Sequence, residues 1–156
     1  MTGRAEIEGE KRRLDATFKR VSNLGADPEL LSDFARYLCV LVSGFLERAT
    51  TEIALEYVRT HSHPSVLRHV ERRLRHSTNM NTERIIQLFG GFDPEWHKDL
   101  ELQIVDEYKA AVDSVVALRH RVVHGGANAS ITMARVQNYY DCVKYVVEHI
   151  ADLCIP

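Results

Sequence analysis

Apolar residues recur every three or four positions along most of this 156-residue chain, and no stretch alternates strictly between apolar and polar residues. A spacing of three or four positions places side chains on one face of an α-helix, whereas strict alternation is typical of a β-strand. Glycine and proline residues divide this pattern into segments. The sequence therefore predicts an all-α protein of about six helices, over residues 5–24, 28–60, 64–76, 80–89, 94–123 and 132–154.

Two short segments have the composition of helix boundaries. In Gly25–Glu29, and again in Gly90–Glu95, glycine is followed by aspartate and then by proline. Glycine is common where a helix ends, aspartate caps the first amides of the next helix, and proline is tolerated in the first turn. Three long helices with short connections indicate an antiparallel bundle, completed by two short helices and an N-terminal one. We expect one domain over residues 1–156.

Composition excludes several classes of protein. Hydrophobic residues make up 45% of the chain and charged residues 27%, which is typical of a globular domain. The longest apolar run, Leu38–Leu46, has nine residues, whereas a membrane span needs about 20. The N-terminus is charged, and the three cysteines are far apart in the sequence. We therefore expect no membrane partner, a cytoplasmic location, and free thiols that pack between helices.

A local basic patch stands out against a net charge of −2. The stretch from His61 to His76 contains four arginines and only one glutamate, and it also contains four of the eight histidines. Phosphate groups of RNA would be attracted to such a helix, although a solvated helix face without a ligand is an alternative interpretation. The candidate RNA-binding residues of this stretch are Arg68, Arg72 and Arg75.

One arginine interrupts an apolar stripe. At about 100° per residue, Arg119 falls on the same face as the valines that precede and follow it by one turn. A guanidinium there is costly unless it is paired, for example with Glu47 or Glu52, or opens into a cleft. His124 ends the same helix, directly before Gly125 and Gly126, and this placement favours the edge of a cleft.

The segment Leu118-Arg-His-Arg-Val-Val-His-Gly125 resembles the R-x4–6-H motif of the HEPN superfamily (higher eukaryotes and prokaryotes nucleotide-binding domains). The helical pattern and the stretch Ser43-Gly-Phe-Leu-Glu47 are similar to the RiboL-PSP-HEPN branch. In this family the motif lies near one end of a long helix in an all-α bundle. The position after the arginine is commonly asparagine in the family, and here it is His120.

The resemblance implies a metal-independent endoribonuclease without a cofactor. RNA supplies its own nucleophile, the 2′-hydroxyl, so the protein needs a base, an acid and a cation, and the products are a 2′,3′-cyclic phosphate and a 5′-hydroxyl. We expect His124 to act as base or acid and Arg119 to hold the phosphate. His120 would position the phosphate or hold His124. Arg121 is a further candidate RNA contact, and Glu47 a possible supporting residue.

The resemblance also implies partners. Family nucleases bring two motifs together across a two-fold axis, so we expect a homodimer whose interface forms the active site. Proteins of this kind resemble toxins of toxin–antitoxin pairs, phage-defence effectors and RNA-processing enzymes. An antitoxin or another regulatory protein is therefore a possible partner.

Three alternatives remain open at this point. A non-catalytic helical module could bind RNA, a nucleotide or a protein, because fold does not determine function. A structural dimer could use Arg119 only in an ion pair. A metal site could use His120 and His124, which are four residues apart, but no third ligand has convincing spacing and the H-E-x-x-H motif is absent. We expect no metal.

Overall fold

A computed structural model describes residues 3–76, 78–125 and 130–156, and within these ranges the chain forms α-helices and no β-strand. The all-α prediction is confirmed. The helices are α1 (Gly3–Ser22), α2 (Pro28–His61), α3 (Pro64–Leu74), α4 (Thr82–Gly90), α5 (Pro94–Gln103), α6 (Asp106–Val123) and α7 (Met133–Cys154).

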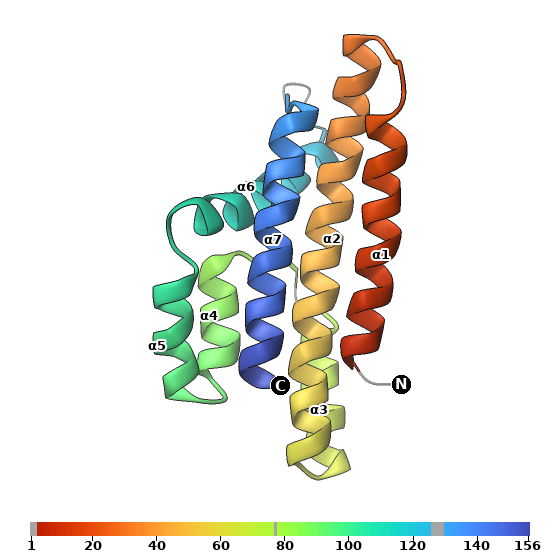
Figure 1. The fold of residues 1–156 in the computed structure, drawn as a ribbon. Helices are drawn as coiled ribbons and strands as arrows, with labels where there is room; N and C mark the ends of the chain where they lie inside the picture. Colours follow the sequence, from red (N-terminus) through yellow and green to blue (C-terminus); the bar gives the residue numbers. More distant parts are fainter. Residues whose placement is uncertain (1–2, 77, 126–129) are drawn as a thin grey trace.

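Helix α2 is the centre of the bundle. It has 34 residues and contacts α1, α3, α6 and α7 (Figure 1). The colour gradient of Figure 1 shows that α1 runs opposite to α2 and that α7 runs in the same direction as α2. Helices α4 and α5 pair with each other, and α6 packs against both α2 and α7. The residues of α2 from Leu38 to Leu46 are accordingly buried on nearly all sides.

The helix starts follow the predicted chemistry. Asp27 accepts a hydrogen bond from the amide of Leu30 (2.8 Å), and Asp93 accepts one from the amide of Glu95 (2.8 Å). Proline is the first residue of α2, α3 and α5, where its missing amide hydrogen costs nothing. These starts were predicted correctly because caps depend on neighbouring residues only.

The fifth predicted helix, 94–123, is wrong as a single element, because the structure divides it into α5 and α6. The helix ends at Gln103, and the next residue, Ile104, is buried in the core. Asp106 then adopts φ 51°, the left-handed region that aspartate tolerates better than most residues. Burial of Ile104 thus turns the chain at a point without glycine or proline. The apolar stripe is also shorter than predicted, because Val105 and Val123 are exposed.

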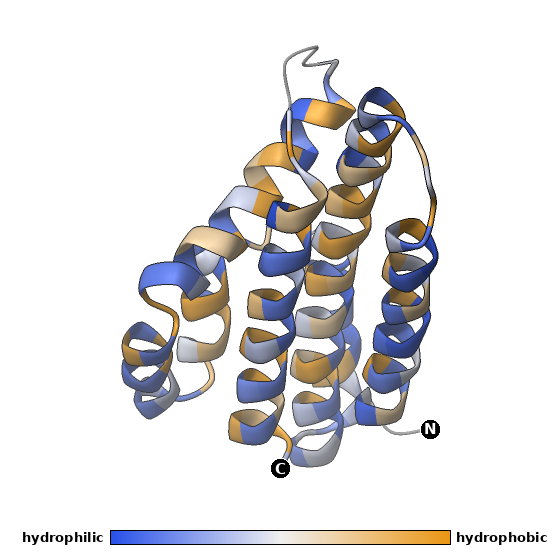
Figure 2. Cartoon of the chain, turned by 45° about the horizontal axis from the view of Figure 1, so that its top comes forward, coloured by the Kyte–Doolittle hydropathy of each residue, from blue (hydrophilic) through white to orange (hydrophobic). Residues whose placement is uncertain are grey.

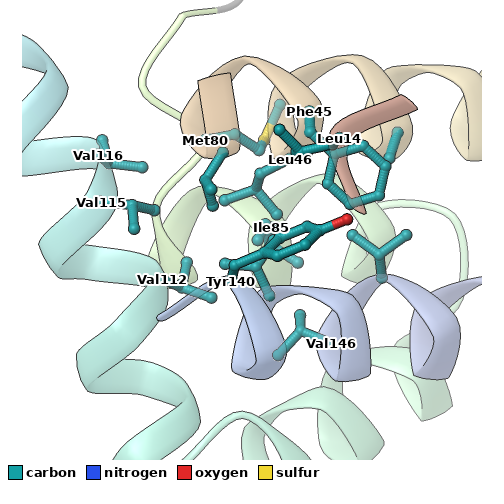
Figure 3. Close-up of a cluster of buried hydrophobic side chains, with 14 of the residues drawn as sticks. Leu14, Phe45, Leu46, Met80, Ile85, Val112, Val115, Val116, Tyr140 and Val146 are labelled. Atoms are coloured by element: carbon teal, nitrogen blue, oxygen red, sulfur yellow. The ribbon is translucent and has the colours of Figure 1, made fainter. Parts of the chain in front are cut away.

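Three aromatic rings join α1, α2 and α7 in the core, and two of them, Phe45 and Tyr140, are labelled in Figure 3. The rings of Phe18 and Tyr140 are stacked with centroids 4.6 Å apart, and Phe45 meets Tyr140 edge-on at 6.3 Å. The Tyr140 hydroxyl donates to Asp15 Oδ1 at 2.6 Å. Apolar and polar bands alternate along the helices (Figure 2), as expected for helices with one face in the core.

The three cysteines are free and buried, as predicted. Burial raises the pKa of Cys39 to about 11 and that of Cys154 to about 12, so these thiols are poor nucleophiles. None of the helices within the described ranges combines the length and apolarity that crossing a bilayer requires.

Candidate active site at the end of helix α6

Helix α6 ends directly at the histidine of the predicted motif. His124 leaves the helical conformation (φ −95°, ψ 21°), and its amide still donates to the carbonyl of His120 at 3.1 Å. Gly125 follows with φ 78°, a conformation that favours glycine. Gly126, the other half of the predicted stop, lies outside the described residues.

His120 and His124 form a pair on the surface. Their imidazole rings lie 4.4 Å apart, centre to centre, and are tilted by 52°. Residues four apart share one face of a helix, and both side chains are exposed because no described helix covers this face of α6. Two of the three predicted catalytic residues are thus brought together by the helix itself.

Arg119 lies on a different face of α6. Its side chain is half-buried, and the neighbouring Val115 and Leu118 are buried. No carboxylate of the described residues forms an ion pair with Arg119. The alternative interpretation, an ion pair with Glu47 or Glu52, is therefore not observed among the described residues.

The position of α6 is fixed by its apolar face. Val112 and Val115 are completely buried, and the carbonyl of Val115 lies 4.0 Å from Cys39 Sγ of α2. Packing on this side leaves the last turn of α6 projecting with its polar residues exposed. A cavity of about 580 Å³ opens beside this turn, and both His120 and Arg121 line it.

The basic residues of α3 form a separate surface. Arg68 and Arg72 lie about 40° apart on the side of α3 turned away from its half-buried leucines and valine, and Arg75 directly follows α3 at the cavity that Leu74 also lines. All three are exposed, and none forms an ion pair with a described residue. We call Arg68, Arg72 and Arg75 the α3 basic face.

Glu47 lies away from the motif. It lines a cavity of about 340 Å³ that also includes Glu52 and Arg75, the residue directly after α3, but neither Arg119 nor either motif histidine. Burial, and then the nearby Glu6, raise the pKa of Glu52. Helix α6 meets α2 at Cys39, and Glu47 follows about two turns further along α2. The structure does not bring Glu47 to the motif.

Three polar residues near the motif were missed by the sequence reasoning. Asn79 and Asn81, from the segment before α4, and Asp113 of α6 line the cavity beside His120. No local signal marks them, because the segment around residue 80 reaches α6 only through the fold. Among the described residues, no three histidine, cysteine, aspartate or glutamate side chains are grouped to hold a metal ion.

The family model of RiboL-PSP-HEPN matches residues 5–155, which is nearly the whole chain. Comparison with curated proteins and with solved structures gave no significant match. The match begins within the first turn of α1 and extends beyond the end of α7. The chain therefore belongs to the RiboL-PSP-HEPN family.

Proposed function

We propose that this protein is a metal-independent endoribonuclease whose active site contains Arg119, His120 and His124. The observation that carries the proposal is the exposed pair of imidazoles at the end of α6, on the same helix as Arg119, whose guanidinium pairs with no carboxylate of the described residues. Membership of a HEPN family agrees with an RNA- or nucleotide-directed function. The alternative is a non-catalytic module that binds RNA, a nucleotide or a protein.

The residue types suit cleavage through the 2′-hydroxyl of RNA. One imidazole removes the proton from this hydroxyl, which then attacks the adjacent phosphorus. The bond between phosphorus and the 5′-oxygen breaks as a second group protonates this oxygen. The products are a 2′,3′-cyclic phosphate and a 5′-hydroxyl. The Arg119 guanidinium can donate two parallel hydrogen bonds to phosphate oxygens, and so stabilise the charge that develops on them.

The positions of Arg119 and His124 favour a site shared by two chains. The two residues are five positions apart, which corresponds to about 140° around a helix and about 7.5 Å along it. A phosphate held against His124 of one chain is thus poorly placed for Arg119 of the same chain. In a homodimer with the two α6 ends together, a second copy supplies the missing arginine or histidine.

We propose that the α3 basic face and Arg121 guide the RNA. Unpaired guanidinium groups attract phosphates and release counterions on binding. Because Arg75 shares a cavity with Glu47 rather than with the motif, this surface would contact nucleotides several positions from the cleaved bond. In the cell, such a nuclease would act as a toxin or defence effector that an antitoxin or another regulatory protein restrains.

The proposal is tested by incubating end-labelled RNA with the purified protein in EDTA. Wild type is expected to produce cyclic-phosphate ends, and Arg119→Ala and His124→Ala are expected to lose this activity while they remain folded. His97→Ala serves as the matched control, because His97 is exposed on α5 and does not line the cavity beside the motif. RNA that is bound but not cleaved by wild type would support the non-catalytic alternative instead.

A further inference from the structure

The cavity beside His120 is built by a tight turn that the core anchors. Met80 is 2% exposed and belongs to the same buried cluster as Val115 and Val116 of α6 (Figure 3). Around it, the amide of Asn81 donates to the carbonyl of Asn79 at 2.8 Å, and Asn79 adopts φ 60°. The buried methionine thus holds two asparagines at the edge of the cavity.

Two of the six side-chain polar atoms of Asn79, Asn81 and Asp113 already have partners. Asn81 Oδ1 accepts the amide of Arg84 at 3.0 Å, and Asp113 Oδ1 accepts the amide of Thr82 at 2.9 Å. These bonds fix both side chains at the start of α4. The amide NH2 of Asn81 and the second oxygen of Asp113 have no partner among the described residues, and the same holds for the side chain of Asn79.

The cavity therefore offers a defined set of hydrogen-bonding groups. Asp113 supplies a carboxylate acceptor, and the two asparagines supply amide donors. The side chains of Val116 and Ala117 add apolar surface, and the exposed imidazole of His120 provides a ring on which a flat group can stack. A volume of about 580 Å³ lies within the usual range of small-ligand sites.

We propose that this cavity binds a guanine base of the RNA next to the cleaved bond. The Watson–Crick edge of guanine carries two adjacent donors, N1–H and the 2-amino group, beside the acceptor O6. Asp113 accepts from these two donors through Oδ2 and the remaining lone pair of Oδ1, while an asparagine amide donates to O6. Adenine, cytosine and uracil each present only one donor group on this edge, so they match Asp113 less well. That the bound base lies next to the cleaved bond rests on the proposed function, which places the reaction at His120 and His124.

Direct binding tests the pocket without any cleavage. Guanosine 5′-monophosphate and the adenosine, cytidine and uridine monophosphates are titrated into the protein, and NMR shifts of the Ala117 and His120 amides are followed. We expect the guanine nucleotide to bind at least about tenfold more tightly than the others. Equal binding of all four, or shifts confined to residues elsewhere, would overturn the inference.

Asp113→Asn changes only the recognition group. The new side chain keeps an oxygen for the amide of Thr82, but it replaces the free acceptor by a donor, so the preference for guanine should be lost. Asp141→Asn is the matched control, because Asp141 is exposed on α7 and the variant keeps an acceptor for Gln137 Nε2 (3.1 Å in wild type). An Asp113→Asn protein that retains the preference would contradict the proposal.

A second variant covers the case in which Asp113→Asn does not fold. Asn79→Gly removes one amide donor, and glycine adopts φ 60° without strain, so weaker binding of the guanine nucleotide is expected. Sequencing of the RNA ends separates the two proposals. Cleavage without a guanine preference would overturn the pocket alone, whereas selective nucleotide binding without cleavage would overturn only the nuclease.

Discussion

His120 and His124 lie with their rings 4.4 Å apart, so removing one imidazole alters the surroundings of the other. Residues that act as a unit lose activity non-additively. We expect His124→Ala to lower the cleavage rate about 10²–10⁴-fold, and His120→Ala/His124→Ala to be no slower than the single variant. Single-turnover kinetics with excess protein measure this. Independent roles would instead make the double variant slower by the product of the two single effects.

Neutralising the α3 basic face should weaken RNA binding without affecting stability. In Arg68→Gln/Arg72→Gln we expect lower affinity, and a salt dependence whose slope falls by about 0.7 for each phosphate contact removed from a single strand. Fluorescence anisotropy at several salt concentrations gives this slope.

The matched control for the basic face is Arg12→Gln/Arg84→Gln. It removes the same charge from exposed positions on α1 and α4. If both double variants bind RNA equally well, α3 is only a solvated helix face. The melting temperatures of both should stay close to that of wild type, because all four arginines are exposed.

Tyr140→Phe tests the hydrogen bond that connects α7 to α1. The variant keeps the ring stack on Phe18 but loses the bond from the hydroxyl to Asp15 Oδ1 at 2.6 Å. We expect a loss of about 1 kcal/mol in the free energy of unfolding, or about 2–4 °C in melting temperature. Urea unfolding and calorimetry measure it. An unchanged stability would mean that Lys144 Nζ, which lies 3.2 Å from Asp15 Oδ1, or water satisfies this carboxylate without the phenol.

Glu52→Gln should stabilise the protein at neutral pH. Burial and the neighbouring Glu6 raise the pKa of Glu52 above its ordinary value of 4.5, so the folded state holds this proton more strongly than the unfolded state. The stability contributed by Glu52 therefore falls as the pH rises from 4.5 through the folded pKa. The melting temperature of the variant should exceed that of wild type at pH 7, and the gain should disappear below about pH 4.5.

The opposite outcome for Glu52 is also informative. Arg59 Nη1 lies 4.0 Å from Glu52 Oε1, and it also pairs with Glu56. A lower melting temperature of Glu52→Gln at pH 7 would mean that the contact with Arg59 outweighs burial and the repulsion by Glu6. Melting curves between pH 4 and pH 8 distinguish these cases.

Helix boundaries could be predicted wherever their cause is local. Asp27 and Asp93 cap helices by bonding amides two or three residues away, and a sequence shows such neighbours directly. The break between α5 and α6 has a different cause. Ile104 is buried by residues from other helices, and only the folded chain reveals that α6 must leave the direction of α5 at this point.

The residues of the candidate site also fall into two groups, those that local sequence spacing places together and those that only the fold brings together. His120 and His124 are four residues apart on one helix, so the sequence already indicated that they share a face. Asp113 and Asn81 are brought together by the amide of Thr82 at the start of α4, which no periodicity reveals. Glu47 was a candidate supporting residue because it ends the Ser43–Glu47 stretch that resembles the family, but in the structure it shares a cavity with Arg75 instead.

Contacts between the first and the last helix have a consequence for synthesis of the chain. Arg4 Nε donates to the carbonyl of Ile155 at 3.1 Å, and the Tyr140 hydroxyl reaches across to α1, so contacts of the folded protein join the first helix to the last. A ribosome releases α1 and α2 well before α7, and the apolar surface that α7 covers stays open until then. Helix α6 packs against both α2 and α7, so its packing is incomplete until α7 has been synthesised. For the proposed nuclease, this order of events means that the motif at the end of α6 gains its full packing only after α7 has emerged from the ribosome.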